Sequence, residues 1–152
     1  MLGNFLFKII TKIIATRLGN FVGDFMTSNQ FSFIKGRSIH QCIAIASDMV
    51  NVLDKSSFRG AMAIKVDIQK AFDTMEWGFL LNVLRKFGFC ETFVKWIFEI
   101  LSSSLISVLF NGEPHGYFSC SRGVKQGDPL SPILFCLAEE VISRIILLAE
   151  SF

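Results

Sequence analysis

The sequence has few of the residues that build metal or disulfide frameworks. Its four cysteines form no CxxC pair and it has only two histidines, so a structural zinc site is not expected. Scattered free thiols are typical of a reducing, intracellular compartment. The net charge is only +2, which by itself does not indicate a nucleic-acid-binding protein. A domain held together by disulfides or by a structural zinc ion is therefore excluded. No function follows from these shortages.

No stretch is long and apolar enough to cross a bilayer, although 51% of the 152 residues are hydrophobic and 17 are Phe. A spanning helix needs about 20 mostly apolar residues. The longest candidate, residues 93–111, is interrupted by Lys95, Glu99 and three serines. We therefore expect no membrane span. The apolar excess favours a fragment of a larger protein, whose surface would pack against other parts.

The N-terminal third carries mostly basic charge. Lys8 and Lys12 interrupt the apolar core that a secretory signal needs, but a basic, amphipathic start is also typical of a mitochondrial presequence. The alternative is that these residues belong to the fold. On that interpretation the expected compartment is nuclear or cytoplasmic, with a mitochondrial location as the other possibility.

Apolar residues at helical spacing predict five helices, over about residues 6–18, 39–54, 79–87, 93–101 and 132–145. The second helix is expected to bury one side. That side consists of Ile43, Ala46, Met49, Val50 and Leu53. In the last helix, Ser131 is expected to be the capping residue before Pro132.

Two segments are expected to be extended. Ala61–Asp67 is short and apolar and ends in an acid, which predicts a central strand with a carboxylate at its end. Asn111-Gly112 is a strong turn signal, so residues 106–110 and 117–121 are expected to form a β-hairpin. Helices and strands together predict an α+β fold.

Asp67 is a candidate metal ligand. A carboxylate at the end of a buried strand is costly unless it is paired or binds a cation. Nucleotidyl transfer by two metal ions needs such a group, although an Asp at this position could also simply cap a turn. The nearby acids Asp73 and Glu76 are expected to cap and start the following helix.

The loop from Ser121 to Ser131 is a candidate phosphate-binding segment. It contains Arg122, Lys125 and two glycines, and it leads into a helix N-terminus, which favours anions. It matches neither the GxGxxG nor the Walker pattern.

Together these segments resemble the reverse transcriptases of LINE-type (non-LTR) retrotransposons, in a plant-like form. Residues 65–73 resemble motif A, and RGVKQGDPLSP at 122–132 resembles motif B. The helix of residues 4–18 and QFSFIKGR at 30–37 also agree with the family in order. The resemblance implies a partial right-hand polymerase, with fingers-side helices over about 1–60 and the palm over about 61–152, truncated before motif C.

The resemblance also implies roles for individual residues. Asp67 would be the catalytic carboxylate and, with the backbone carbonyl of Ile68, would bind the two Mg²⁺ ions of the intact family. Phe72 would be the steric gate against ribonucleotides, and Gln126 and Gly127 would contact the incoming nucleotide. The template and primer would contact Lys35, Arg37 and Arg122. The implied partners are an RNA template, a DNA primer and deoxynucleoside triphosphates.

The sequence departs from the family pattern at both ends. The basic fingers residues that hold the triphosphate in the family normally precede Asn4, and the chain does not include them. It contains no Ala-Asp-Asp of motif C, and Glu139-Glu140 lies on the helix after motif B, where it cannot easily replace that turn. We therefore expect that this chain alone does not polymerise DNA. Three interpretations stay open: a truncated RNA-directed DNA polymerase, a non-catalytic remnant that binds RNA or an RNA–DNA duplex, and a group II intron maturase-type reverse transcriptase.

Overall fold

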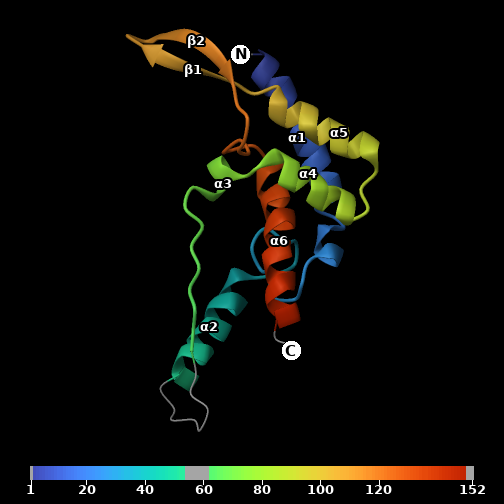
Figure 1. Ribbon diagram of the computed structural model, residues 1–152, viewed down its shortest axis with the longest axis vertical. Coiled ribbons are helices and arrows are strands. Elements are labelled where there is room, and N and C mark those ends of the chain that lie inside the picture. The colour runs from blue at the N-terminus through green and yellow to red at the C-terminus, as the bar shows by residue number, and fades with distance from the viewer. Residues whose placement is uncertain (1, 54–61, 150–152) are drawn as a thin grey trace.

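The computed structural model describes residues 2–53 and 62–149 of the chain, without the side chains of residues 2–4. In these ranges the chain has an α+β fold, as predicted (Figure 1). The order of elements is α1 (Leu2–Leu18), η1 (Val22–Phe25), α2 (Ile39–Leu53), α3 (Ala71–Thr74), α4 (Trp77–Lys86), α5 (Glu91–Ser102), β1 (Leu105–Phe110), β2 (Glu113–Ser119) and α6 (Ser131–Ala149).

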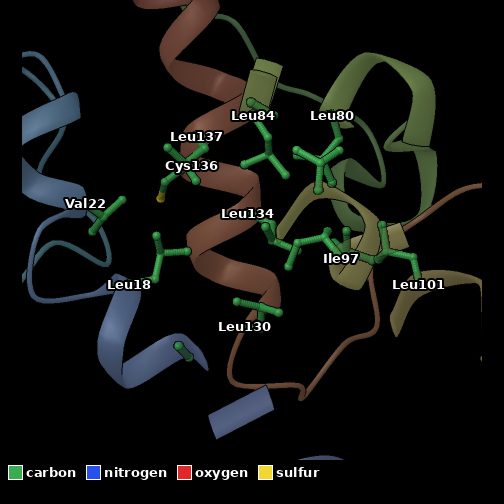
Figure 2. Close-up of a cluster of buried hydrophobic side chains, with 14 of the residues drawn as sticks. Leu18, Val22, Leu80, Leu84, Ile97, Leu101, Leu130, Leu134, Cys136 and Leu137 are labelled. Atoms are coloured by element: carbon green, nitrogen blue, oxygen red, sulfur yellow. The ribbon is translucent and has the colours of Figure 1, made fainter. Parts of the chain in front are cut away.

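Helix α6 forms the centre of the hydrophobic core. Figure 2 shows its side chains between the N-terminal segment on one side and α4 with α5 on the other. Apolar residues at helical spacing on α4, α5 and α6 give each helix a stripe that the others cover. The most deeply buried apolar side chains are Leu18, Val22, Leu80, Leu84, Val94, Ile97, Leu130, Leu134, Cys136 and Leu137.

The ends of α4 follow the predicted local chemistry. The Glu76 carboxylate accepts hydrogen bonds from the backbone N–H groups of Gly78 and Phe79, which have no partner within the helix. The helix ends before Gly88, whose φ of 88° is in the left-handed region that favours glycine. The predicted cap at Glu76 and the predicted stop at Gly88 are confirmed.

The predicted hairpin is also confirmed. Strands β1 and β2 pair antiparallel, and Phe110 lies opposite Glu113 across the turn. Asn111 and Gly112 have φ values of 50° and 86°, the two positive values that a tight two-residue turn requires. Strand β2 starts at Glu113, earlier than the predicted residue 117, because pairing continues directly from the turn.

The predicted central strand at 61–67 is wrong for the residues that the structure describes. Ala61 lies outside the described residues, and residues 62–68 have no regular secondary structure and are exposed. In Figure 1 this segment runs alone between α2 and α3. A strand needs a neighbour for its backbone N–H and C=O groups. Within the described ranges, the hairpin is the only sheet and it does not reach this segment.

The predicted buried side of α2 is wrong as well, although the helix itself is confirmed. None of its residues is buried, and Ile43, Met49 and Val50 are about 60% exposed. The reason is that α2 extends away from the other helices (Figure 1). Amphipathic spacing predicts the helix, but burial also needs an element that packs on its apolar side.

No helix among the described residues is long and apolar enough to span a membrane.

Candidate functional site

The two segments that carry the sequence motifs lie against each other. The Gly123 N–H donates to the Met75 carbonyl at 2.7 Å, and the Val124 N–H donates to the Phe72 carbonyl at the same distance. The indole N–H of Trp77 donates to the Gly123 carbonyl, also at 2.7 Å. Residues 72–77 and 123–124, about fifty positions apart in the chain, therefore form one hydrogen-bonded unit.

Gly123 permits this close approach. Its φ is 88°, and a Cβ built on it would lie 2.9 Å from the Asp73 carbonyl oxygen. Real Cβ atoms essentially never come so close to another heavy atom, so a side chain here would push the two segments apart. Glycine at this position is a requirement of the contact between the segments.

The loop that leads into α6 is held by its own polar side chains. Asp128 is buried, and its Oδ1 accepts a hydrogen bond from the Leu130 N–H at 2.9 Å. The Ser131 hydroxyl donates to the Lys125 carbonyl at 2.7 Å, so it connects the start of α6 to the loop. The predicted cap by Ser131 is therefore wrong: its hydroxyl is a donor to the loop, and the Leu130 N–H that Asp128 binds lies just before the first residue of α6. Gln126 and Gly127 remain exposed at the tip of this loop.

A pocket of about 550 Å³ lies beside the loop, between it, α5 and the base of the hairpin. Its walls combine apolar side chains such as Phe7 and Trp77 with the basic residues Arg122 and Lys125. The Lys125 ammonium lies 5.3 Å from the centre of the Phe7 ring, a cation–π contact that orients it across the pocket. Arg122 is exposed and lines the same pocket.

Asp67 and Ile68 lie outside this pocket. Both are exposed on the extended segment, and in the described ranges no group of three His, Cys, Asp or Glu residues could together hold a metal ion. Asp67 can therefore offer one carboxylate and the Ile68 carbonyl one further oxygen. These donors alone do not fit a pair of Mg²⁺ ions, which need several oxygen ligands held in place.

Phe72 is half-buried beside the motif contact. Its ring stacks on Phe135 of α6, with 5.1 Å between centroids and 18° between planes, and it packs against the core. Its backbone carbonyl is also the acceptor for Val124. The structure thus gives Phe72 a packing role, and the steric-gate role stays a prediction.

The predicted template residues differ in their surroundings. Lys35 is exposed. The Arg37 guanidinium instead donates to the carbonyls of Thr27 and Gln30 at 2.5 and 2.6 Å, and to those of Gly23 and Met26 at 3.4 and 3.3 Å. Arg37 therefore holds its own loop together. A direct contact between Arg37 and template stays a prediction, and it would compete with these four carbonyls.

Sequence reasoning missed a buried polar network on α6. The Glu140 carboxylate accepts hydrogen bonds from the Thr27 N–H, the Thr27 hydroxyl and the Arg144 guanidinium. Arg144 in turn donates to the Phe25 carbonyl at 2.7 Å. A signal was present in the sequence, since Glu140 and Arg144 are an oppositely charged i, i+4 pair in a largely apolar helix.

Comparison with known proteins gives consistent matches over almost the whole chain. The sequence model of a family described as reverse transcriptase (RNA-dependent DNA polymerase) matches residues 1–150. The chain is 28% identical over 134 residues to the transposon TX1 uncharacterized 149 kDa protein of Xenopus laevis, and 30% identical over 139 residues to the Retrovirus-related Pol polyprotein of element R2DM from Drosophila melanogaster. It is 28% identical over 138 residues to the corresponding R2 polyprotein of Nasonia vitripennis.

These alignments cover 88–91% of this chain but only 10–13% of each relative. The chain thus spans about a tenth of the length of these relatives. They come from a frog and two insects, so they do not support the plant-like part of the resemblance.

Proposed function

The chain belongs to the family of reverse transcriptases, the RNA-dependent DNA polymerases, and on this premise we propose that it is the fingers-to-palm part of a non-LTR retroelement polymerase. The observation that carries the proposal is the direct bonding of residues 72–77 to residues 123–124. Residues 72–73 are the end of the segment that resembles motif A, residues 74–77 follow it directly, and residues 123–124 belong to the segment that resembles motif B. The contact joins the end of the first segment, which includes Phe72, to the start of the second.

Each motif contributes its own part. Reverse transcriptases generally use Mg²⁺, and Asp67 with the Ile68 carbonyl would supply some of its ligands, while the acids of motif C are missing from this chain. Phe72 would limit access to the sugar, and Gln126 and Gly127 would meet the incoming deoxynucleotide. Their exposure at the loop tip leaves them free for such a contact.

Lys35 and Arg122 would contact the phosphates of the RNA template and the DNA primer. Both are exposed, as phosphate contacts require, and neither is in an ion pair in the described part of the chain. Few basic residues are available in total, so we expect weak binding that falls steeply with salt. The compartment in which such a fragment would act is proposed to be nuclear or cytoplasmic.

We propose further that this chain alone binds nucleic acid without polymerising DNA. One carboxylate cannot hold the metal pair that in-line nucleotidyl transfer needs. Primer extension on an RNA template with Mg²⁺ and deoxynucleotides tests this point. We expect no incorporation by the 152-residue chain, and incorporation that disappears in Asp67→Asn would contradict the proposal.

The proposed nucleic-acid binding is tested with an RNA–DNA duplex, whose binding is measured by fluorescence anisotropy at several salt concentrations. We expect Lys35→Ala and Arg122→Ala each to reduce the slope of log K against log salt by about 1. The matched control is Lys95→Ala, an exposed lysine on α5 away from both motifs, which is expected to leave the slope unchanged. An absence of binding at low salt would refute this part of the proposal.

A further inference from the structure

The loop of residues 26–37 is held in place by side chains rather than by regular secondary structure. After η1 the backbone from Met26 to Arg37 forms only turns and bends. A loop of this kind would be mobile unless its backbone groups were bound elsewhere. It carries Lys35, the exposed base that the proposed function assigns to the template. The contacts that hold this loop therefore determine the position of the Lys35 ammonium.

Glu140 binds the loop from one side. Its side chain is completely buried, and both carboxylate oxygens lie 3.1 Å from the Thr27 backbone nitrogen. The Thr27 hydroxyl donates to the same carboxylate at 3.2 Å, and the Arg144 Nε lies 3.0 Å from it. A buried carboxylate is costly unless such donors satisfy it. The loop is therefore most stable in the position in which Thr27 donates to Glu140.

Arg37 binds the same residue from the other side, through the Thr27 carbonyl. The peptide groups around Thr27 are thus held by an anion at the N–H and by a cation at the C=O. Arg144 adds a further connection, since it donates to the Phe25 carbonyl while its guanidinium lies 4.9 Å from the centre of the Phe87 ring. Glu140 and Arg144 of α6 therefore bind two nearby backbone positions, Thr27 in the loop and Phe25 at the end of η1.

Helix α6 connects this loop to motif B. Its first residue, Ser131, is hydrogen-bonded to Lys125 of the motif B loop, and Glu140 lies nine residues later, about 14 Å along the axis. A packed helix of this length is rigid, because its interior bonds and the core hold it straight. The position of the Lys35 loop relative to Gln126 and Gly127 is therefore set through the contacts of the loop with α6, at Glu140 and also at Cys136, whose thiol is hydrogen-bonded to Gln30 and to the Ser32 carbonyl.

We propose that Glu140 is a positioning residue that holds the Lys35 loop against the motif B helix, so that Lys35 and the motif B loop meet the same nucleic-acid backbone. The inference rests on the proposed function for its ligand, an RNA strand. Glu140 itself does not contact the RNA. It acts by fixing where the Lys35 charge lies.

The test is a double-mutant cycle in RNA binding by the 152-residue chain, with a 5′-labelled single-stranded RNA as the probe. In the wild type, Lys35→Ala is expected to reduce the salt slope by about 1 and to weaken binding. In a Glu140→Gln background, Lys35→Ala is expected to have a clearly smaller effect, because the lysine is then positioned less firmly. The matched control is Glu139→Gln on the same helix, in which Lys35→Ala keeps its full effect.

Hydrogen exchange gives a readout that does not depend on RNA. The Thr27 amide is expected to exchange at least tenfold faster in Glu140→Gln, while the amides of α6 stay protected. Should Glu140→Gln fail to fold, Arg37→Lys is the second variant, since it keeps the charge and loses the fork that binds Thr27 and Gln30. The same reduction of the Lys35 effect is expected there.

The outcomes separate the two claims. Absence of RNA binding by the wild-type chain at low salt would overturn both the proposed function and this inference. RNA binding by the wild type, with a full Lys35→Ala effect retained in the Glu140→Gln and Arg37→Lys backgrounds, would overturn the inference alone. Unchanged exchange of the Thr27 amide in a folded Glu140→Gln chain would overturn it as well.

Discussion

At the scale of single residues, backbone groups carry the contact between the two motifs. Gly123 donates to Met75 and accepts from Trp77, and its missing side chain is what lets Asp73 approach. The side chains proposed to bind metal or nucleic acid, such as Asp67 and Lys35, are by contrast exposed. Apart from Phe72, the residues that build the contact are therefore not the residues proposed to act in the site.

Gly123→Ala is expected to destabilise the chain by about 2–4 kcal/mol. An alanine would have to adopt a left-handed φ, and its Cβ would also meet the Asp73 carbonyl at 2.9 Å. Urea unfolding followed by circular dichroism measures the change in the free energy of unfolding.

The matched control is Gly127→Ala in the same loop. Gly127 has a φ of 76° with nothing within 4 Å of the added Cβ, so only the conformational cost of about 1 kcal/mol is expected. Equal losses in the two variants would show that the close approach at Gly123 contributes nothing.

Cys136 is expected to make stability fall at high pH. Burial raises the pKa of its thiol from the ordinary value of 9.0 to about 11, although a hydrogen bond from Gln30 lowers it and the Glu139 charge raises it slightly. Because the folded pKa lies above the unfolded one, the contribution is complete below pH 9 and is lost as pH rises from 9 towards 11. The loss is at most about 1.4 kcal/mol per pH unit.

The measurement is the free energy of unfolding at pH 8 to 11 in the wild type and in Cys136→Ala. Other groups also titrate in this range, so the difference between the two chains isolates the thiol. A constant difference across the range would contradict the assignment. The exposed Cys42 offers a control for the loss of a thiol, because Cys42→Ala is expected to change the free energy of unfolding at pH 8 by less than about 0.5 kcal/mol.

At the scale of elements, the helices that pack on α6 are well defined by their own sequences. Helix α4 has a capping carboxylate at its start, basic residues in its last turn and an apolar stripe between them. Helix α2 also has an apolar stripe, yet none of its residues is buried. A helix thus forms from local signals, whereas its position depends on whether another element covers its apolar side.

Glu76→Ala is expected to reduce the free energy of unfolding by about 1 kcal/mol. The substitution leaves the N–H groups of Gly78 and Phe79 without their acceptor at the start of α4. Thermal or urea unfolding measures the effect. Glu76→Gln is the control, since its amide oxygen can still accept, and a loss equal to that of alanine would argue against capping.

At the scale of the whole molecule, the described surface is unusually apolar. Large hydrophobic side chains are exposed on α2, on both strands of the hairpin, on the 62–68 segment and along the second half of α6. Monomeric soluble proteins rarely expose apolar patches of this extent. Such surfaces are typical of regions that bind other protein.

The isolated chain is therefore expected to self-associate as its concentration rises and to bind a hydrophobic dye while folded. Replacing Ile43 and Met49 on α2 with lysine is expected to reduce both effects and to change stability by less than about 0.5 kcal/mol, since both side chains are at least 60% exposed. Sedimentation velocity and dye fluorescence are the measurements.

The control for this experiment is Leu134→Lys, which places a charge in the core and is expected to unfold the chain. A wild-type chain that stays monomeric and binds no dye would show that these side chains are covered in solution.

Local chemistry in the sequence determined most of the elements. Helical spacing predicted α1, α2, α4, α5 and α6, because side chains three and four apart share a face whatever the rest of the chain does. The Asn111-Gly112 turn and the Glu76 cap followed from backbone requirements that a few adjacent residues satisfy. Family membership followed from two motifs that are specific at the level of residue type.

Only the tertiary structure decided which of these elements meet. The bonding of residues 72–77 to Gly123, the burial of Glu140 on Thr27, and the exposure of α2 and of residues 62–68 all depend on partners distant in the chain. A periodic pattern indicates that a side chain can be buried or that a strand can pair. It does not indicate which other element covers the side chain or pairs with the strand, because packing and strand pairing are contacts between two elements.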